Sequence, residues 1–283
     1  MPMHRIFIVL TGNIIFVTLI LVASRSSYYG SRLGHTQVTQ RPRYIFIDIG
    51  ANRADTLEVF LKQKSAKFEY DFPRPDWATY DQAGEHAQSN LKSYGSVNIL
   101  TKLKSSLELE IHLFEANPHF NAALLHAKER HVELGVQVEI YPSTVADIKD
   151  GTRIFYLDTV NTAHDFWGSS IYASHPDVVR SKNNGTELST VNLSRWLLMN
   201  TLPRDFVVVK MDVEGSEYEL VPHMAEMGVS AVLDYLLVEW HPSVIDKADL
   251  PEDEVTFRHA RMKAAEEKLK AEGVNMPHYD SSA

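Results

Sequence analysis

Cysteine is absent from the 283 residues of this chain, which excludes disulfides, thiolate metal sites and cysteine nucleophiles. An excess of positive charge is absent as well. The formal net charge is −9 at pH 7, whereas a nucleic-acid-binding protein usually carries a basic face, so no nucleic acid is expected as a partner. Apolar side chains are plentiful: 44% of the residues are hydrophobic, enough to build a large core without disulfides.

The longest apolar run lies near the N-terminus. After a short tail at residues 1–5, residues 6–23 are almost wholly apolar and close in number to the ~20 residues that span a bilayer. They predict a single-pass transmembrane signal-anchor, with a cleavable signal peptide as the alternative. Arginines follow the span, which favours a cytosolic domain, whereas a Golgi or ER signal-anchor would place the domain in the lumen. Residues 24–43 predict a linker or stem.

A strand that runs into a glycine turn opens the main domain. Residues 44–49 are aromatic or β-branched apart from Asp48, and a turn with Gly50 and Asn52 follows. A buried strand that ends in this way is typical of a Rossmann-like nucleotide site, with the ligand at the carboxyl end of the strand. A nicotinamide dehydrogenase would carry Gly-x-Gly-x-x-Gly here, and residues 50–55 lack that pattern.

Two later strands also end in acidic residues. The predicted strand at residues 110–115 ends at Glu115, whose carboxylate can accept hydrogen bonds from two ribose hydroxyls. The predicted strand at residues 206–211 runs into Asp212 and Glu214, which can point the same way while the strand alternation lasts.

Strands and helices alternate along the chain. Further strands are expected at residues 136–141, 153–157 and 235–238, the second of them after a hairpin signal at Asp150-Gly151. Residues 251–271 predict one amphipathic helix. This order of elements predicts an α/β fold with a doubly wound, mainly parallel sheet.

The expected domain covers residues 44–245 and contains a long insert at about residues 64–106. The insert is polar and aromatic with little periodicity, so it is either a substrate-facing lid or a surface excursion. Residues 246–283 are expected to form a C-terminal helix and tail.

Four segments together carry a family resemblance: residues 46–52, 113–118, 210–218 and 238–241. In this order they resemble the FkbM-type S-adenosylmethionine-dependent methyltransferases, over roughly residues 44–242. The Lys-x-Asp-x-Glu-Gly-x-Glu pattern that begins at Lys210 is the most specific part. The resemblance implies a Rossmann-like class I methyltransferase fold, S-adenosylmethionine as the cofactor, and O-methylation of a hydroxyl on a sugar, glycan or small molecule.

The resemblance also implies roles for individual residues. The implied cofactor-binding residues are Asp48, Gly50 and Asn52 in the first turn, Glu115 at the ribose, and Ala146 and Asp147 at the adenine. Asp212 and Glu214 match the acidic strand end that faces cofactor and acceptor, and are the expected catalytic carboxylates.

Proton removal from the acceptor hydroxyl needs a further group. His241 is the candidate general base because the ordinary pKa of histidine lies near neutrality, although a structural histidine at a strand end is the alternative. Asp212, Glu239 and His241 could instead hold a divalent metal that lowers the pKa of the hydroxyl. Two other functions stay open at this point: a nicotinamide-dependent Rossmann oxidoreductase, and a non-catalytic module that binds cofactor or glycan.

Overall fold

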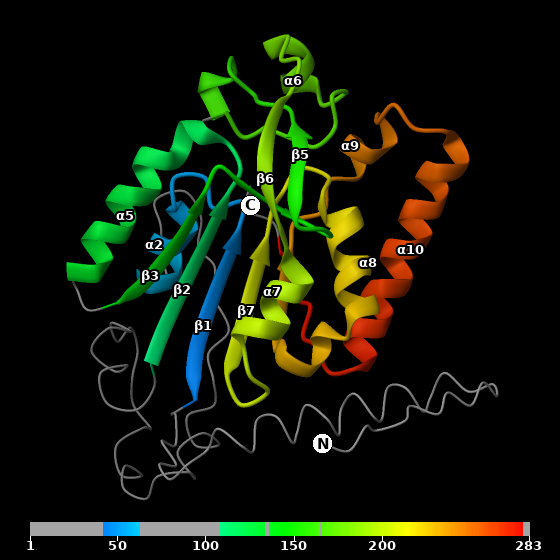
Figure 1. Cartoon of the computed structure of the whole chain (residues 1–283). Coiled ribbons are helices and arrows are strands. Elements are labelled where there is room, and N and C mark those ends of the chain that lie inside the picture. The colour runs from blue at the N-terminus through cyan, green and yellow to red at the C-terminus, as the bar shows by residue number, and fades with distance from the viewer. Residues whose placement is uncertain (1–41, 63–107, 134–135, 165, 280–283) are drawn as a thin grey trace, which may run out of the picture. The chain divides into compact units, whose positions relative to one another are not determined.

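A five-stranded parallel sheet lies at the centre of the chain (Figure 1). The computed structural model describes residues 42–62, 108–133, 136–164 and 166–279, which belong to one unit, Arg41–Ala283. The strands in spatial order are β3 (Gln137–Pro142), β2 (Glu108–Glu115), β1 (Arg43–Ile49), β7 (Phe206–Met211) and β8 (Tyr235–Val238). The predicted α/β fold with a mainly parallel sheet is confirmed.

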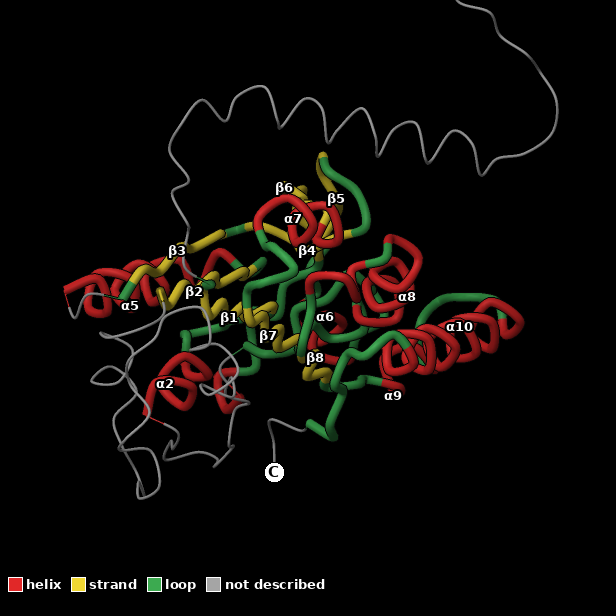
Figure 2. Tube along the Cα trace, turned by 90° about the horizontal axis from the view of Figure 1, so that it is seen from below, coloured by secondary structure: helices red, strands yellow, loops and turns green. Residues whose placement is uncertain are grey.

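Helices cover both faces of this sheet, as Figure 2 shows from the end. Because side chains alternate along a strand, β1 sends Ile45 and Ile47 to one face and Tyr44 and Phe46 to the other. The first face packs against α7 (Leu193–Asn200), α8 (Glu217–Met227) and α10 (Glu252–Ala271). The second packs against α2 (Asp55–Lys62) and α5 (Asn121–Glu133). Both faces of β1 are therefore core, which explains why residues 44–47 are all apolar or aromatic.

A smaller sheet follows β3 along the chain and has the order β4-β6-β5. Its strands are β4 (Thr144–Asp147), β6 (Thr186–Asn192) and β5 (Gly151–Phe155). The hairpin predicted at Asp150-Gly151 is wrong, because β6 lies between β4 and β5, parallel to the first and antiparallel to the second. Short helical segments complete this region: η2 (Pro118–Phe120), η3 (Thr162–His164) and α6 (Pro176–Ser181).

The C-terminal segment packs onto the sheet. The predicted helix at residues 251–271 is present as α10, with Ala265 and Leu269 buried in the core beside α8. Two short helices, η4 (Val229–Val232) and α9 (Pro242–Asp246), flank β8. The chain then returns to β8, where the amide of Leu236 donates to the carbonyl of Asn275 at 2.9 Å. Tyr279 is buried in the core, so the tail extends the folded unit.

Three predicted segments lie outside the described residues: the span at 6–23, most of the linker at 24–43, and the insert at 64–106. Within the part of the chain that the structure describes, no helix combines the length and apolarity needed to cross a membrane.

Candidate active site

The carboxyl ends of the four strands β2, β1, β7 and β8 meet at one edge of the sheet. Backbone hydrogen bonds join the turns that follow them. The amide of Gly50 donates to the carbonyl of Phe114 at 3.0 Å, and the amide of Asp212 donates to the carbonyl of Ile49 at 3.0 Å. The three acidic segments singled out in the sequence are thereby brought together, as expected at the carboxyl edge of an open parallel sheet.

Gly50 is required by this close approach of the turns. Its φ is +83°, and a Cβ placed on it would lie 1.9 Å from the carbonyl oxygen of Asp212. Any side chain would collide with backbone there, so glycine is the residue that fits.

Asp48 is fully buried beneath the turn and pairs with Lys210. The Lys210 Nζ lies 3.1 Å from Asp48 Oδ1 and donates to the carbonyl of Gly50 at 2.9 Å. Burial raises the pKa of Asp48 to about 6, although the charge of Lys210 acts in the opposite direction. Burial lowers the pKa of Lys210, but the charges of Asp48 and Asp212 outweigh it and the pKa is raised overall. The ammonium group thus stays charged inside the sheet edge.

A cavity of about 570 Å³ opens above these turns. Glu115 lines it, and its Oε1 accepts from the amide of Asn117 at 2.7 Å and its Oε2 from the amide of Asn52 at 2.7 Å. Burial raises the pKa of Glu115 to about 7 despite these two hydrogen bonds. Asn52 adds an unused group, because its Oδ1 is buried with no hydrogen-bond donor among the described residues.

Some of the predicted site residues line this cavity and others lie behind it. The lining includes Gly50, Asn52, Glu115, Ala146, Asp212 and Glu214, with Lys210 and Glu239. Asp48 lies behind the wall, where it holds Lys210. Asp147 is not part of the lining either. Its carboxylate accepts from the amide of Ile148 and pairs with Arg153 at 3.1 Å.

His241 stands behind the acidic lining and is held by a buried carboxylate. Its backbone amide and its Nδ1 both contact Oε1 of Glu217, at 2.8 and 2.9 Å, and Glu217 is fully buried. Burial lowers the pKa of His241, but the hydrogen bond with Glu217 and the nearby carboxylates raise it to about 10. At neutral pH the raised pKa favours the doubly protonated, positively charged imidazolium form of His241 in the ligand-free protein.

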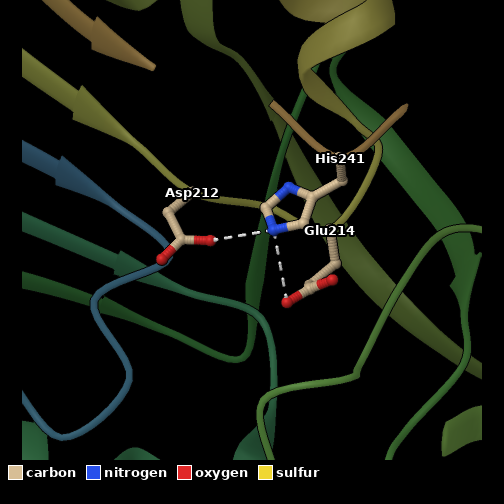
Figure 3. A group of neighbouring side chains, drawn as sticks. All are labelled: Asp212, Glu214 and His241. Carbon is tan, nitrogen blue, oxygen red and sulfur yellow. Dashed lines mark ion pairs between the residues drawn. The ribbon is translucent and has the colours of Figure 1, made fainter. Parts of the chain in front are cut away.

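Four carboxylates surround that imidazole. In Figure 3 the ring nitrogen Nε2 points between Asp212 and Glu214, at 3.8 Å from Oδ1 of the first and 3.6 Å from Oε1 of the second. Glu239 lies 3.9 Å from the same nitrogen, and Glu217 contacts the other ring nitrogen, Nδ1. The end of β7 and the end of β8 thus form one strongly acidic corner of the cavity.

The loop after β5 also lines the cavity, and no role is predicted for it from the sequence. Ser169 fixes it, because its hydroxyl accepts from Asn117 Nδ2 at 3.0 Å and from the amide of Asp158 at 2.9 Å. Phe166 and Trp167 line the cavity from this loop, and Trp167 is 44% exposed. The sequence shows only a polar loop with one tryptophan here, so no local pattern identifies this part of the cavity.

No role is predicted for Lys210 from the sequence either, although its place in an apolar strand indicates that it has a charged partner. It is the one charged residue within the apolar strand β7, and a lysine buried in a central strand needs a charged partner.

A family model supports this picture. The model for the methyltransferase FkbM domain matches residues 48–268, which covers the β1 turn, both acidic strand ends and α8 to α10. No curated protein and no solved structure matches the chain at a significant level. The match spans more than half of the 283 residues and contains all the strand ends that form the cavity. The chain therefore belongs to the FkbM methyltransferase family.

Proposed function

We propose that this methyltransferase uses S-adenosylmethionine and methylates a hydroxyl group of a sugar, glycan or small molecule. The observation that carries the proposal is Glu115. It is a buried carboxylate at the carboxyl end of the strand next to β1, and it lines the cavity. In Rossmann-like folds an acid at this place binds the two hydroxyls of the cofactor ribose.

The residues of the cavity fit S-adenosylmethionine. The volume of about 570 Å³ lies within the range of small-molecule sites. Glu115 would accept from the ribose, and the buried Oδ1 of Asn52 would accept from the cofactor's ammonium group. Ala146 and Phe155 offer an apolar wall for the adenine. The cofactor supplies an electrophilic methyl group, and these residues orient it.

Polar and aromatic groups face the rest of the cavity. Asp212, Glu214 and Glu239 can accept hydrogen bonds from several hydroxyls of one acceptor. Trp167 also lines the cavity and is 44% exposed, and an indole ring is a side chain on which a sugar ring can stack. This pairing of carboxylates with an aromatic face supports a polyhydroxylated acceptor.

The hydroxyl proton must leave during methyl transfer, and the group formed by Asp212, Glu214 and His241 is the proposed recipient. Two carboxylate oxygens and one imidazole nitrogen face one another there. His241 can act as the base only in its neutral form. Asp212 and Glu214 line the cavity directly and can accept a hydrogen bond from the acceptor oxygen.

The test is binding followed by turnover. The full-length protein, purified in detergent, should bind S-adenosylmethionine in a calorimeter. Incubation with panels of glycans and small alcohols should then give products heavier by one methylene unit. Cofactor binding without any methylated product would favour a non-catalytic binding module. Absence of cofactor binding would refute the proposed function.

A further inference from the structure

Three potential ligand atoms converge at the acidic corner of the cavity. Asp212 Oδ1, Glu214 Oε1 and His241 Nε2 approach one another in Figure 3, and one ligand atom from each residue lies within 4.8 Å of the others. The imidazole nitrogen is 3.8 and 3.6 Å from the two oxygens. Both distances exceed a hydrogen bond. The three atoms therefore face a common point without bonding directly to one another.

Other residues hold the far side of His241 and Asp212. Glu217, fully buried, contacts Nδ1 of His241 at 2.9 Å and so directs Nε2 toward the cavity. The Lys210 ammonium lies 3.5 Å from Oδ2 of Asp212, which leaves Oδ1 on the side of His241. A carboxylate behind a histidine is the usual partner that orients a metal-binding imidazole.

Glu214 is oriented in the same manner. His175 Nδ1 accepts from the amide of Asp177 at 3.2 Å, so the proton is on Nε2, which donates to Oε2 of Glu214 at 3.2 Å. The hydroxyl of Ser170 donates to the backbone carbonyl of Glu214 at 2.7 Å. Oε1 is thereby turned toward His241. Each of the three residues has a separate partner on its outer side, and each presents one atom inward.

The spacing and the charge fit a metal ion. Ligand atoms about 2.1 Å from one ion are about 3.0–3.4 Å apart in octahedral or tetrahedral geometry. The imidazole nitrogen, at 3.8 and 3.6 Å from the two oxygens, would therefore need to approach each of them by less than about 1 Å. The corner also contains more carboxylates than cations. Four of them lie within 4 Å of the ring of His241. A divalent cation would offset their mutual repulsion.

We propose that Asp212, Glu214 and His241 bind one divalent transition-metal ion, of the Mn²⁺ or Zn²⁺ kind. Imidazole with carboxylates suits these ions, whereas Mg²⁺ prefers oxygen ligands alone. The set differs from the sequence hypothesis, which had Glu239 in place of Glu214. Glu239 Oε1, 3.9 Å from the imidazole nitrogen, lies close enough to become a fourth ligand.

The catalytic role of the ion rests on the proposed function, whereas ion binding does not. With the ion bound, Asp212, Glu214 and His241 would act as ligands and would no longer receive the proton. The acceptor hydroxyl would bind at the open position, where its pKa falls and its proton passes to solvent. The oxygen would then form a bond to the methyl carbon. The bond from that carbon to sulfur would break and leave its electron pair on the sulfur.

Titration with Mn²⁺ tests the site directly. The full-length protein, stripped with a chelator and then freed of it, is titrated while free Mn²⁺ is followed by electron paramagnetic resonance. We expect one bound ion per chain, and affinity weakened at least about tenfold in both Glu214→Gln and His241→Gln. The matched control is Asp246→Asn, which removes an exposed carboxylate 2.8 Å from His259 and should bind as the wild type does. Equal binding by all four proteins, or no wild-type binding at millimolar Mn²⁺, would overturn the proposal.

A second measurement covers variants that fail to fold. In the wild-type protein, bound Mn²⁺ should broaden the imidazole resonances of His241 much more strongly than those of His259, because paramagnetic broadening falls steeply with distance from the ion. Equal broadening of both histidines would overturn the proposed site. Calorimetry with S-adenosylmethionine in the presence of chelator separates the two ideas. If the protein binds S-adenosylmethionine but no metal ion, the metal site is refuted and the proposed function stands. If it does not bind S-adenosylmethionine, the proposed function is refuted.

Discussion

Binding of S-adenosylmethionine should tighten as the pH rises through 7, because Glu115 must lose its proton to accept fully from both ribose hydroxyls. Burial raises the pKa of this carboxyl to about 7, against the effect of its two amide donors. A group with that pKa is about 9% ionised at pH 6 and about 91% ionised at pH 8. The affinity should therefore rise up to about tenfold between these values, or about 1.4 kcal/mol.

Calorimetry at pH 6, 7 and 8 on the wild type and on Glu115→Gln measures this effect. Glutamine keeps the shape but has one acceptor oxygen, and its amide NH₂ faces one of the two backbone donors. At pH 8 the variant should bind more weakly by about 1–3 kcal/mol, or about 5- to 150-fold. The affinity of Glu115→Gln for S-adenosylmethionine should also change less between pH 6 and pH 8 than that of the wild type. The control is Glu139→Gln, which changes a half-exposed carboxylate on β3 that pairs with Lys128.

The decisive quantity is the difference between the wild type and Glu115→Gln in how cofactor affinity changes with pH. An ionisable group of the cofactor itself would contribute equally to the pH dependence of both proteins. Identical changes of affinity with pH for wild type and Glu115→Gln would refute the placement of Glu115 at the ribose. So would equal affinities at pH 8.

Four further outcomes are expected. Gly50→Ala puts a methyl group 1.9 Å from a backbone oxygen, at a residue whose φ is +83°. The free energy of unfolding in urea should fall by about 2–5 kcal/mol. A variant as stable as the wild type would contradict the close approach of the turns. Lys210→Met leaves Asp48 buried without its cation and should cost about 3–5 kcal/mol at pH 8 and less at pH 5, where Asp48 is protonated; a pH-independent loss would contradict the pair. Trp167→Ala should raise KM for the acceptor and leave the Kd for the cofactor unchanged, whereas unchanged KM would remove it from the acceptor site. If residues 6–23 anchor the chain, the protein should stay in the membrane pellet after alkaline carbonate extraction, and release to the supernatant would count against the anchor.

The strands β1, β7 and β8 of the central sheet were predictable because they are buried on both faces. β7 and β8 consist of apolar residues apart from one lysine and one tyrosine, and such runs need no distant information. β6 is different. Its sequence between Thr186 and Asn192 has only Leu188 and Val191 as large apolar residues, so it becomes a strand through pairing with β4 and β5. The false hairpin at Asp150-Gly151 followed from missing that strand.

The site divides in a similar way. Glu115, Asp212 and Glu214 were found because they lie at or just after the carboxyl ends of predicted strands, and parallel strands bring these ends to one edge. His175 could not be predicted in this way, because it lies in the turn before α6 and contacts Glu214, which is 39 positions away in the sequence. Its neighbours give no sign of that contact. Residues placed by strand ends are readable from local pattern, whereas residues placed by loop packing need the assembled fold.

Three residues with strained backbone conformations line the cavity, and their orientation also depends on the assembled fold. Asn52, Phe166 and Glu214 all line the cavity and all have positive φ, at 49°, 59° and 48°. Conformations of this kind cost of order 1–3 kcal/mol each and persist only where surrounding contacts fix them. The amide of Asn52 is held by Glu115, and the carbonyl of Glu214 by the hydroxyl of Ser170. Both partners come from distant parts of the chain, so the orientation of these side chains is set only once the sheet and the loop after β5 have come together. Loss of the Ser170 hydroxyl would therefore disturb Glu214 more than a change of similar size on the open rim of the cavity.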